Sequence, residues 1–439
     1  MNGPLVALAD VVDDPIFSAI GFLNEIMTRY PDAISFAPGA PYLDGLDRAV
    51  LSDALDAFLK HSCEVEGLSP TAAWKRIIEY GPSKGIVNSL LARSLRDDYG
   101  IQATADDVVV TVGAQEAFLL ILRCLFNPAK DQLAYVVPCF PGIRGAAAFL
   151  GINTVAIPEN PAGPDLGVLR EACATARAAG QRIAALYVAP DFSNPSGTIM
   201  SARARAELLE LAAEEELLLL EDSTYGFSAS EVGSVPPSLK ARDTGGMVVQ
   251  IGTLSKLCFP GARVGFVVAE QMARSATGGA RRLAESLATL KNMTTVNTSP
   301  LAQAVAAGLL LRAGGSLAVR GMIQNGHYVR SRAALLDALD RHLPDAAELG
   351  ISWTRPTGGF FLVVDAPIVL DHAALAACAT EYGVLWTPMS DFYPDGGGSR
   401  SLRLSYSYLT QTQIDEGATR LARFLRTRLL ASPTTEGTR

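Results

Sequence analysis

Short apolar runs alternate with amphipathic segments through the middle of this chain. The runs are rich in Val, Ile and Leu, which predicts buried strands, and the segments between them carry apolar residues at helical spacing. Strands are expected at 106–113, 132–138, 153–158, 182–190, 217–222 and 247–254, and helices at 114–126, 142–151, 166–180 and 202–216. This alternation is typical of an α/β fold whose mostly parallel central sheet is covered by helices on both faces.

The pattern changes after about residue 285. A long helical region at roughly 299–342 leads into strand-like stretches at 358–367, 383–388 and 401–409 and helical ones near 371–382 and 411–430. Strands and helices without regular alternation predict a second, smaller α+β domain. The irregular, Pro- and Gly-punctuated N-terminal segment is expected to wrap onto this domain or onto a partner chain. The expected division is therefore 1–50 for that segment, 51–325 for the large domain, 326–430 for the small domain and 431–439 for a disordered tail.

Composition narrows the class of protein. Of the 439 residues, 49% are hydrophobic and 19% are charged, the opposite of a disordered chain. The net charge of −8 argues against a nucleic-acid binder. The four histidines are isolated and no two of the six cysteines form a CxxC pair, so no metal site or disulfide framework is expected. The N-terminus lacks the basic region of a signal peptide and no apolar run approaches the roughly 20 residues of a membrane span. A cytoplasmic enzyme is expected.

Chemistry-bearing residues follow the expected strands, at the sheet edge where ligands of α/β proteins bind. Lys256, one of only seven lysines, follows the strand at 247–254. Asp222 ends a nearly all-leucine strand, and Asn194 lies in a turn after another. Each has an ordinary alternative: a solvated loop lysine, a helix-capping aspartate, a turn asparagine. The turn at Gly113, before a helix, is a weak anion-site signal by itself.

Taken together, these residues fit the functional groups of a single ligand. A lysine in a desolvated site becomes a nucleophilic amine that can form an imine. Asp222 suits a protonated pyridine nitrogen, and Asn194 with Tyr225 suits a phenolate oxygen. The remaining members of the set suit a phosphate: the hydroxyls of Thr253 and Ser255 and the guanidinium of Arg263. These groups match pyridoxal 5′-phosphate.

Eight motifs along the chain resemble those of fold-type I pyridoxal-phosphate enzymes of the class I/II aminotransferase family. They are YGPSKG (80–85), GAQEA (113–117), PCFPG (138–142), SNPSG (193–197), DSTYG (222–226), TLSKLCFPGARVG (253–265), PTGGFF (356–361) and LRLSYS (402–407). They stand in family order and at family-like spacing. The stretches RYPDAISFAPGAPY and VLWTPMSDFY resemble the hydroxyphenylglycine-type and aminoadipate/kynurenine-type branch.

The resemblance implies a role for each matching residue. Lys256 would bind the cofactor covalently and then shuttle a proton, and it forms the catalytic set with Asp222 and Tyr225. The implied cofactor ligands are Ala114, Gln115, Phe140, Asn194, Asp222, Tyr225, Thr253, Ser255, Lys256 and Arg263, with Tyr80 reaching the phosphate across a dimer interface. Arg403, with Asn194, would bind the substrate carboxylate, and Gly39 belongs to the N-terminal segment that closes over the substrate.

The expected activity follows from these roles. It is transfer of an amino group between an L-amino acid, bulky or aromatic, and a 2-oxo acid by a ping-pong aldimine/ketimine mechanism, in a homodimer with shared active sites. The alternative on the same scaffold is elimination, γ-replacement or carbon–carbon bond formation, for example on S-adenosylmethionine; a regulator of this fold is disfavoured by the acidic charge. Phe36, Tyr42, Phe392 and Tyr393 are candidate pocket residues, although the core is the stronger expectation for each. Arg144, Arg355 and Arg400 are open candidates for binding a second acidic group.

Overall fold

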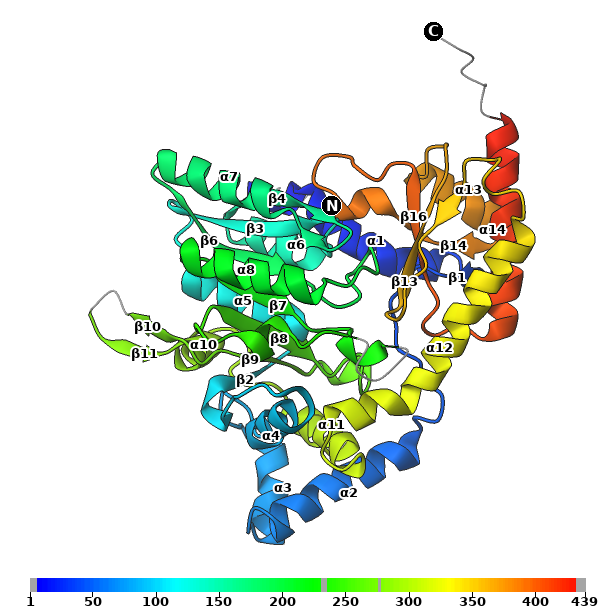
Figure 1. Cartoon of the computed structure of the whole chain (residues 1–439). Helices are drawn as coiled ribbons and strands as arrows, with labels where there is room; N and C mark the ends of the chain where they lie inside the picture. Colours follow the sequence, from blue (N-terminus) through cyan, green and yellow to red (C-terminus); the bar gives the residue numbers. More distant parts are fainter. Residues whose placement is uncertain (1–5, 230–234, 275–277, 432–439) are drawn as a thin grey trace.

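An eight-stranded, mostly parallel sheet forms the centre of the larger part of the molecule (Figure 1). The computed structural model describes residues 6–229, 235–274 and 278–431. The strand order is β2 (Val108–Thr111), β9 (Gly265–Val268), β8 (Val248–Thr253), β7 (Leu218–Asp222), β6 (Arg182–Val188), β3 (Asp131–Val137), β4 (Asn153–Asn160) and β5 (Gly163–Pro164). Strands β8, β7, β6, β3 and β4 are parallel, and β9 runs antiparallel between β8 and β2. The predicted fold class is confirmed.

Helices bury both faces of this sheet, as the continuous apolar strands require. On one face, α5 (Gly113–Leu125), α6 (Pro141–Phe149) and α10 (Leu283–Lys291) enclose one core. On the other, α7 (Leu166–Ala178) and α8 (Ala202–Glu214) enclose a second core that includes Leu169, Leu208 and Leu211. The parallel strands end in loops that lie between these helix layers, and these loops carry the candidate site residues.

A second sheet lies beside the first and has four strands in the order β12 (Ser352–Trp353), β13 (Phe361–Asp365), β16 (Ser401–Ser405) and β15 (Thr387–Pro388). It packs with α13 (His372–Tyr382) and α14 (Gln411–Ala431) around a core containing Trp386 and Phe424. The N-terminal part of the chain joins this body, because β1 (Ile34–Ser35) pairs in parallel with β14 (Val384–Leu385). The small body is thus built from both ends of the chain.

The N-terminal fifty residues are not wholly irregular, and that prediction was wrong. They contain α1 (Pro15–Arg29), which packs against α6. Its start has an ordinary signal, because the Asp14 side chain accepts the N–H of Ile16 and Pro15 occupies the first helical position. Residues 432–439, which hold all but one residue of the expected disordered tail, lie outside the described residues.

The helical region at 299–342 is two helices, α11 (Pro300–Arg312) and α12 (Leu317–His342), bent by 80°. The break contains Gly314 and Gly315, both with positive φ, and Ser316 caps α12 by accepting the N–H of Val319. The expected domain boundary at residue 325 falls inside α12. Within the described residues no single helix meets the length and hydropathy of a membrane span, and only the bent pair α11–α12 meets both together.

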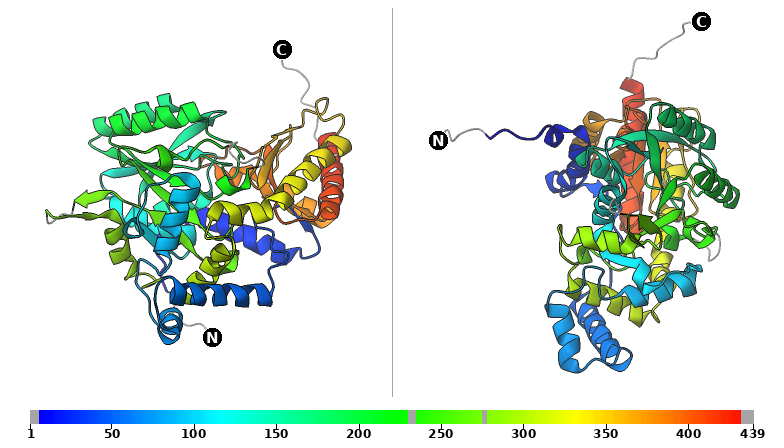
Figure 2. Two further views of the ribbon diagram at one scale, coloured as in Figure 1. Left: turned by 60° about the horizontal axis from the view of Figure 1, so that its bottom comes forward. Right: turned by 90° about the vertical axis from the view of Figure 1, so that its left-hand side faces the viewer.

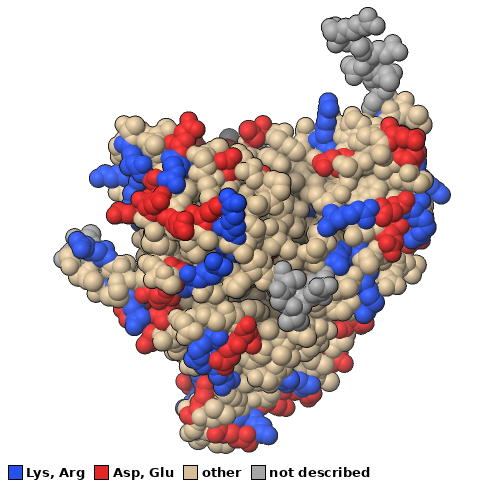
Figure 3. Space-filling model, in the orientation of Figure 1, with Lys and Arg blue, Asp and Glu red and all other residues tan. Residues whose placement is uncertain are grey.

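Helices α2 (Arg48–Glu64) and α3 (Pro70–Ile78) lie at the end of the molecule opposite the C-terminus of α14 (Figures 1 and 2). Helix α2 packs on α11 so closely that a Cβ on Gly308 would lie 1.7 Å from the Ala54 carbonyl oxygen. Helix α4 (Asn88–Tyr99) covers β2, and α9 (Leu239–Arg242) precedes β8. The hairpin β10–β11 (Met272–Arg274, Ala280–Arg282) projects from the body. Acidic and basic side chains are interspersed over the face in Figure 3.

Candidate active site

Lys256 lies just beyond β8, in a mainly buried position facing the N-terminal segment. Its Nζ donates a hydrogen bond of 2.6 Å to the carbonyl oxygen of Gly39. Burial, together with the positive charges of Arg403 and Arg263, lowers the pKa of Lys256 to about 8. The neutral, nucleophilic amine is therefore more populated near neutral pH than it is for an ordinary lysine.

Asp222 ends β7 as a buried carboxylate. Its Oδ2 accepts a hydrogen bond of 2.6 Å from the Tyr187 hydroxyl, and its Oδ1 accepts one from Thr224 Oγ1. Burial raises the pKa of Asp222, while these donors and the nearby charge of Lys256 act in the opposite direction. A buried carboxylate surrounded by donors and lacking an ion-pair partner among the described residues suits a cationic ligand.

Arg403 lies in β16 of the small sheet, and its cationic side chain faces the large sheet. Only 3% of this residue is exposed. Its Nη1 donates to Asn194 Oδ1 over 2.5 Å, and its Nη2 donates to the Ala37 carbonyl oxygen over 2.6 Å and to Thr387 Oγ1 over 3.1 Å. The bond to Asn194 thus joins β16 of the small sheet to the loop that follows β6.

The charge of Arg403 is not neutralised by a neighbouring carboxylate among the described residues. Its guanidinium carbon lies 4.1 Å from the ring centre of Phe361 and 4.8 Å from that of Phe392. Its Nε has no hydrogen-bond partner in the part of the chain that the structure describes. Burial lowers the pKa of Arg403 to about 10, so it remains charged at neutral pH. A buried cation in this state is a ready site for a carboxylate.

An anion cradle lies at the N-terminus of α5. The N–H groups of Gly113, Ala114 and Gln115 belong to the first turn, where a helix supplies no acceptors and carries partial positive charge. The guanidinium of Arg263 lies against this turn, because a Cβ on Gly113 would be 2.3 Å from Arg263 Nη2. Arg263 Nη1 also reaches Ser255 Oγ at 3.5 Å.

The hydroxyl of Thr253, at the end of β8, orders the loop beside the cradle by accepting the N–H of Ser255 over 3.1 Å. The glycine at 113 has φ +68° and leaves the space that Arg263 occupies. The start of α5, the guanidinium of Arg263 and the hydroxyl of Ser255 thus lie next to one another, and together they are the kind of donor set that binds a phosphate ester.

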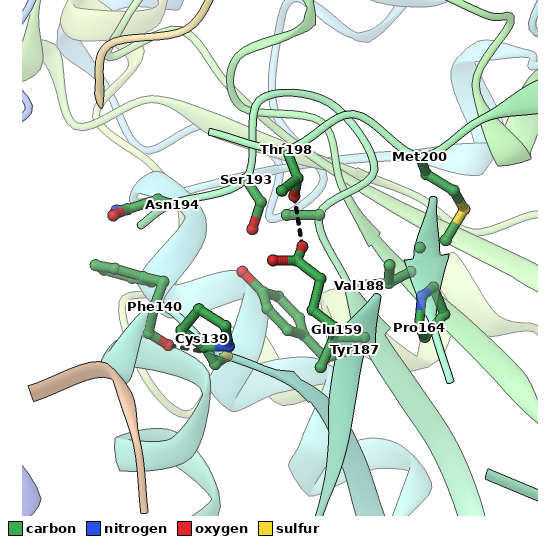
Figure 4. A pocket seen from close by; sticks show the side chains of 14 residues that line it. Cys139, Phe140, Glu159, Pro164, Tyr187, Val188, Ser193, Asn194, Thr198 and Met200 are labelled. Atoms are coloured by element: carbon green, nitrogen blue, oxygen red, sulfur yellow. Dashed lines mark hydrogen bonds between the residues drawn. The ribbon is translucent and has the colours of Figure 1, made fainter. Parts of the chain in front are cut away.

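Phe140 and Tyr225, the aromatic residues expected at the site, lie at its sides. Phe140 and Asn194 line one pocket together with Tyr187, and in Figure 4 the side chains of Phe140 and Asn194 lie at the same end of it. Tyr225 is buried and packs edge-on against Phe360 and Phe361, with ring centres 5.2 and 5.6 Å apart. In the middle of this pocket Thr198 donates to Glu159, and Met200 and Pro164 lie at its other end (Figure 4).

The N-terminal strap, residues 36–42, lies over the site. Its carbonyl oxygens accept hydrogen bonds from Arg403 at Ala37, from Lys256 at Gly39 and from Ser407 at Ala40. A Cβ on Gly39 would lie 2.4 Å from the Phe361 ring, so only glycine allows this approach. The strap thus brings Gly39 to the site residues.

The other candidates occupy different positions. Phe36 is in the core of the small body; Tyr42 stacks on His327 with ring centres 3.6 Å apart; Phe392 packs on Arg403, and half-buried Tyr393 packs beside it. Arg355 pairs with Asp340, Arg400 is exposed, and Arg144 lies over the Tyr135 ring with its buried Nη1 unpartnered among the described residues. Tyr80 is 90% exposed at the surface.

Three residues at the site were not predicted from the sequence: Tyr187, Thr387 and Phe361. Tyr187 has the appearance of a core residue in an apolar strand, and it does belong to a hydrophobic core as well. Its one signal is its position near the end of β6, the strand that pairs with β7.

The fold and site together define a pyridoxal-phosphate enzyme of fold type I. The cradle formed by the first turn of α5 and Arg263, together with the buried Lys256 and Asp222, fits this cofactor, and Arg403 is placed to bind a carboxylate. The family model described as aminotransferase class I and II matches residues 32–421, and the chain belongs to this family. It is a pyridoxal-phosphate-dependent aminotransferase.

Relatives and solved structures agree with this assignment. The (S)-3,5-dihydroxyphenylglycine transaminase of Amycolatopsis orientalis is 43% identical over 416 residues, covering 95% of this chain and 93% of that protein. The kynurenine aminotransferase of Pyrococcus horikoshii, solved with PMP, has a TM-score of 0.77 at 27% identity and 92% and 94% coverage. An α-aminoadipate aminotransferase of Thermus thermophilus, solved with N-(5′-phosphopyridoxyl)-L-leucine, has a TM-score of 0.76 at 28% identity and 96% and 98% coverage.

Proposed function

We propose that this enzyme takes its amino group from an aromatic L-amino acid, of the arylglycine or phenylalanine type, and gives it to a 2-oxo acid. The observation that carries the proposal is the setting of Arg403, a carboxylate-binding cation flanked by the rings of Phe361 and Phe392. A substrate carboxylate bound there has aromatic surface beside it. The relative at 43% identity is named for a dihydroxylated phenylglycine, which supports an aryl side chain.

The chain's own residues divide the work. When bound, pyridoxal phosphate supplies the electron sink that makes the substrate Cα–H acidic. The amine of Lys256, with its pKa lowered to about 8, is suited to take that proton and return it. Asp222 would hold the positive charge of the protonated ring nitrogen at the buried end of the site, and Arg403 would fix the substrate carboxylate. The strap would close the site over a bound substrate, because its carbonyl oxygens already contact Lys256 and Arg403.

We also propose that the enzyme works as a homodimer in which Tyr80 serves the partner's site. Tyr80 and Met293 are 90% and 84% exposed, although both are large and apolar. The segments that carry them lie together, since Ser83 donates to Asn292. Exposed Trp74, Ile78, Val296 and Leu301 extend this apolar surface. An exposed apolar patch of this kind is typical of a protein interface.

A donor and acceptor screen tests the activity. Holoenzyme is mixed with single L-amino acids, and the absorbance of the bound cofactor is followed without an acceptor. An aromatic donor should convert the cofactor to its amino form, and a 2-oxo acid should reverse the change. Mass spectrometry should show the matching oxo acid. Conversion by small aliphatic donors alone would refute the aromatic class, and release of an elimination product from S-adenosylmethionine without this conversion would refute transamination.

A further inference from the structure

A buried ion pair lies next to the phosphate cradle and has no part in the chemistry described above. Lys291, the last residue of α10, has no exposed side-chain surface, and its Nζ donates to Glu116 Oε2. Glu116 belongs to the first turn of α5, directly after the three residues whose N–H groups form the cradle. Burying two charges is costly unless both are fully hydrogen-bonded. Each makes further hydrogen bonds, and these other partners indicate what the pair does.

On one side, Glu116 fixes the backbone that forms the cradle. Its Oε2 also accepts the N–H of Val112 over 2.7 Å. Val112 is the residue at which β2 turns into α5, immediately before Gly113. The carboxylate therefore ties the turn to the helix that follows it, and the direction of the free N–H groups depends on this tie.

On the other side, the pair holds the loop between α10 and α11. Glu116 Oε1 accepts the hydroxyls of Thr295 over 2.6 Å and Thr294 over 3.3 Å. Lys291 Nζ donates to Thr295 Oγ1 over 2.7 Å. In the same loop the non-glycine Val296 has φ +64°, a strained conformation that persists only where surrounding contacts impose it.

This loop continues into the exposed apolar surface that contains Tyr80. Gln303 Nε2 donates to the Thr298 carbonyl oxygen over 2.8 Å, and Gln303 Oε1 accepts the N–H of Ile86 over 2.8 Å. Asn292 accepts the Ser83 hydroxyl. One continuous set of hydrogen bonds thus connects the cradle of this subunit with the segment 80–86.

We propose that the Lys291–Glu116 pair couples phosphate binding at the α5 cradle to association of the subunits through the Tyr80 surface. The pair is a positioning element: it holds the turn at Val112 and the loop at Thr295 in one geometry, so that ordering either one favours the other. The inference rests on the proposed homodimer. Because such coupling is reciprocal, the phosphate-bearing cofactor tightens the dimer by the same factor by which dimerisation tightens cofactor binding.

Three variants of the full-length enzyme test the coupling: Lys291→Met, Glu116→Gln and both together. Glu116→Gln retains an oxygen that accepts the Val112 N–H and keeps the test open if Lys291→Met does not fold. The matched control is Lys240→Met, since Lys240 is also buried and paired, with Glu270, beside β8 rather than at the cradle. Dissociation constants for pyridoxal phosphate come from absorbance titrations of the cofactor-free proteins, and dimer dissociation constants from sedimentation with and without cofactor.

Each single variant should bind pyridoxal phosphate at least tenfold more weakly, because it leaves a buried charge without its partner. The double variant should recover part of the loss. Pyridoxal, which lacks the phosphate, should lose much less affinity. In the wild type, pyridoxal phosphate should lower the dimer dissociation constant at least tenfold, and this ratio should be smaller in the variants. Lys240→Met should lower the melting temperature without changing either quantity.

Two results from the variants would overturn the coupling. One is a variant with reduced melting temperature and unchanged affinity for pyridoxal phosphate, which would make the pair merely structural. The other is an equal loss for pyridoxal and pyridoxal phosphate. A wild-type enzyme that binds cofactor and transaminates as a monomer would refute the proposed dimer and the coupling with it. A wild-type dimer that binds cofactor but fails to transaminate would refute the proposed activity and leave the coupling measurable.

Discussion

Replacing Tyr187 by phenylalanine tests how the buried carboxylate of Asp222 stays ionised. The hydroxyl that would be lost donates to Asp222 Oδ2 over 2.6 Å, and both side chains are buried. A hydrogen bond to a charged group contributes about 1.5–3 kcal/mol. Since about 1.4 kcal/mol corresponds to one pKa unit, losing this bond should raise the pKa of Asp222 by about one to two units.

The pH dependence of cofactor affinity reports this shift. Asp222 can pair with a protonated ring nitrogen only as a carboxylate, so affinity falls as the pH drops through its pKa. In Tyr187→Phe this acid limb should therefore lie about one to two pH units higher than in the wild type. The assay is a titration of cofactor-free protein with pyridoxal phosphate at a series of pH values, followed by absorbance.

Tyr135→Phe is the matched control. Tyr135 is also buried, lies directly opposite Tyr187 in the pairing of β3 with β6, and makes no hydrogen bond to Asp222. Its loss should leave the acid limb in place. An unmoved limb in Tyr187→Phe, or an equal movement in the control, would refute the reasoning that the phenol keeps the carboxylate charged.

Three further predictions concern the same site. Lys256→Ala should abolish turnover. In the wild type, the rate of cofactor attachment should fall about tenfold per pH unit below a pKa of about 8, because only the neutral amine attacks. A rate independent of pH between 6 and 8 would contradict this. Arg403→Lys should lower kcat/KM for the amino acid by about 10- to 100-fold by losing a charged hydrogen bond, with unchanged cofactor affinity; an equal loss of cofactor affinity would argue against a carboxylate site. Gly113→Ala should weaken pyridoxal phosphate binding, since its Cβ would displace Arg263 Nη2 at 2.3 Å and its φ is +68°; the same titration with pyridoxal should show little change.

Much of the large sheet could be predicted because buried parallel strands are continuous apolar runs. The expected run at 217–222 is one residue longer than β7, and the expected run at 247–254 contains β8. The position of β9, antiparallel between β8 and β2, could not be read from these runs, since strand order depends on long-range pairing. Helix α1 was missed although Asp14 and Pro15 mark its start.

The predictable part of the site comes from one polypeptide pattern, a reactive side chain just after a buried strand. That pattern by itself points to Lys256, Asp222 and Asn194. Arg403 does not follow it, because it lies within a strand of the other sheet and meets Asn194 only through tertiary packing, 209 residues away in the chain. Tyr187 does not follow it either, since its polar atom is one hydroxyl on an otherwise apolar side chain.

Because the small body is built from both chain ends, the cofactor-binding and substrate-binding parts of the site form at different times during synthesis. The bond from Thr387 to the Ala37 carbonyl oxygen joins residues 350 positions apart. At roughly 5–20 residues per second, the strap waits roughly 20–70 s on the ribosome for its partner. By then every strand from β2 to β9 has been made, with Asp222 and Lys256 among the residues available. The nascent chain thus completes its cofactor half first, and it gains the means to hold a substrate only when Arg403 emerges.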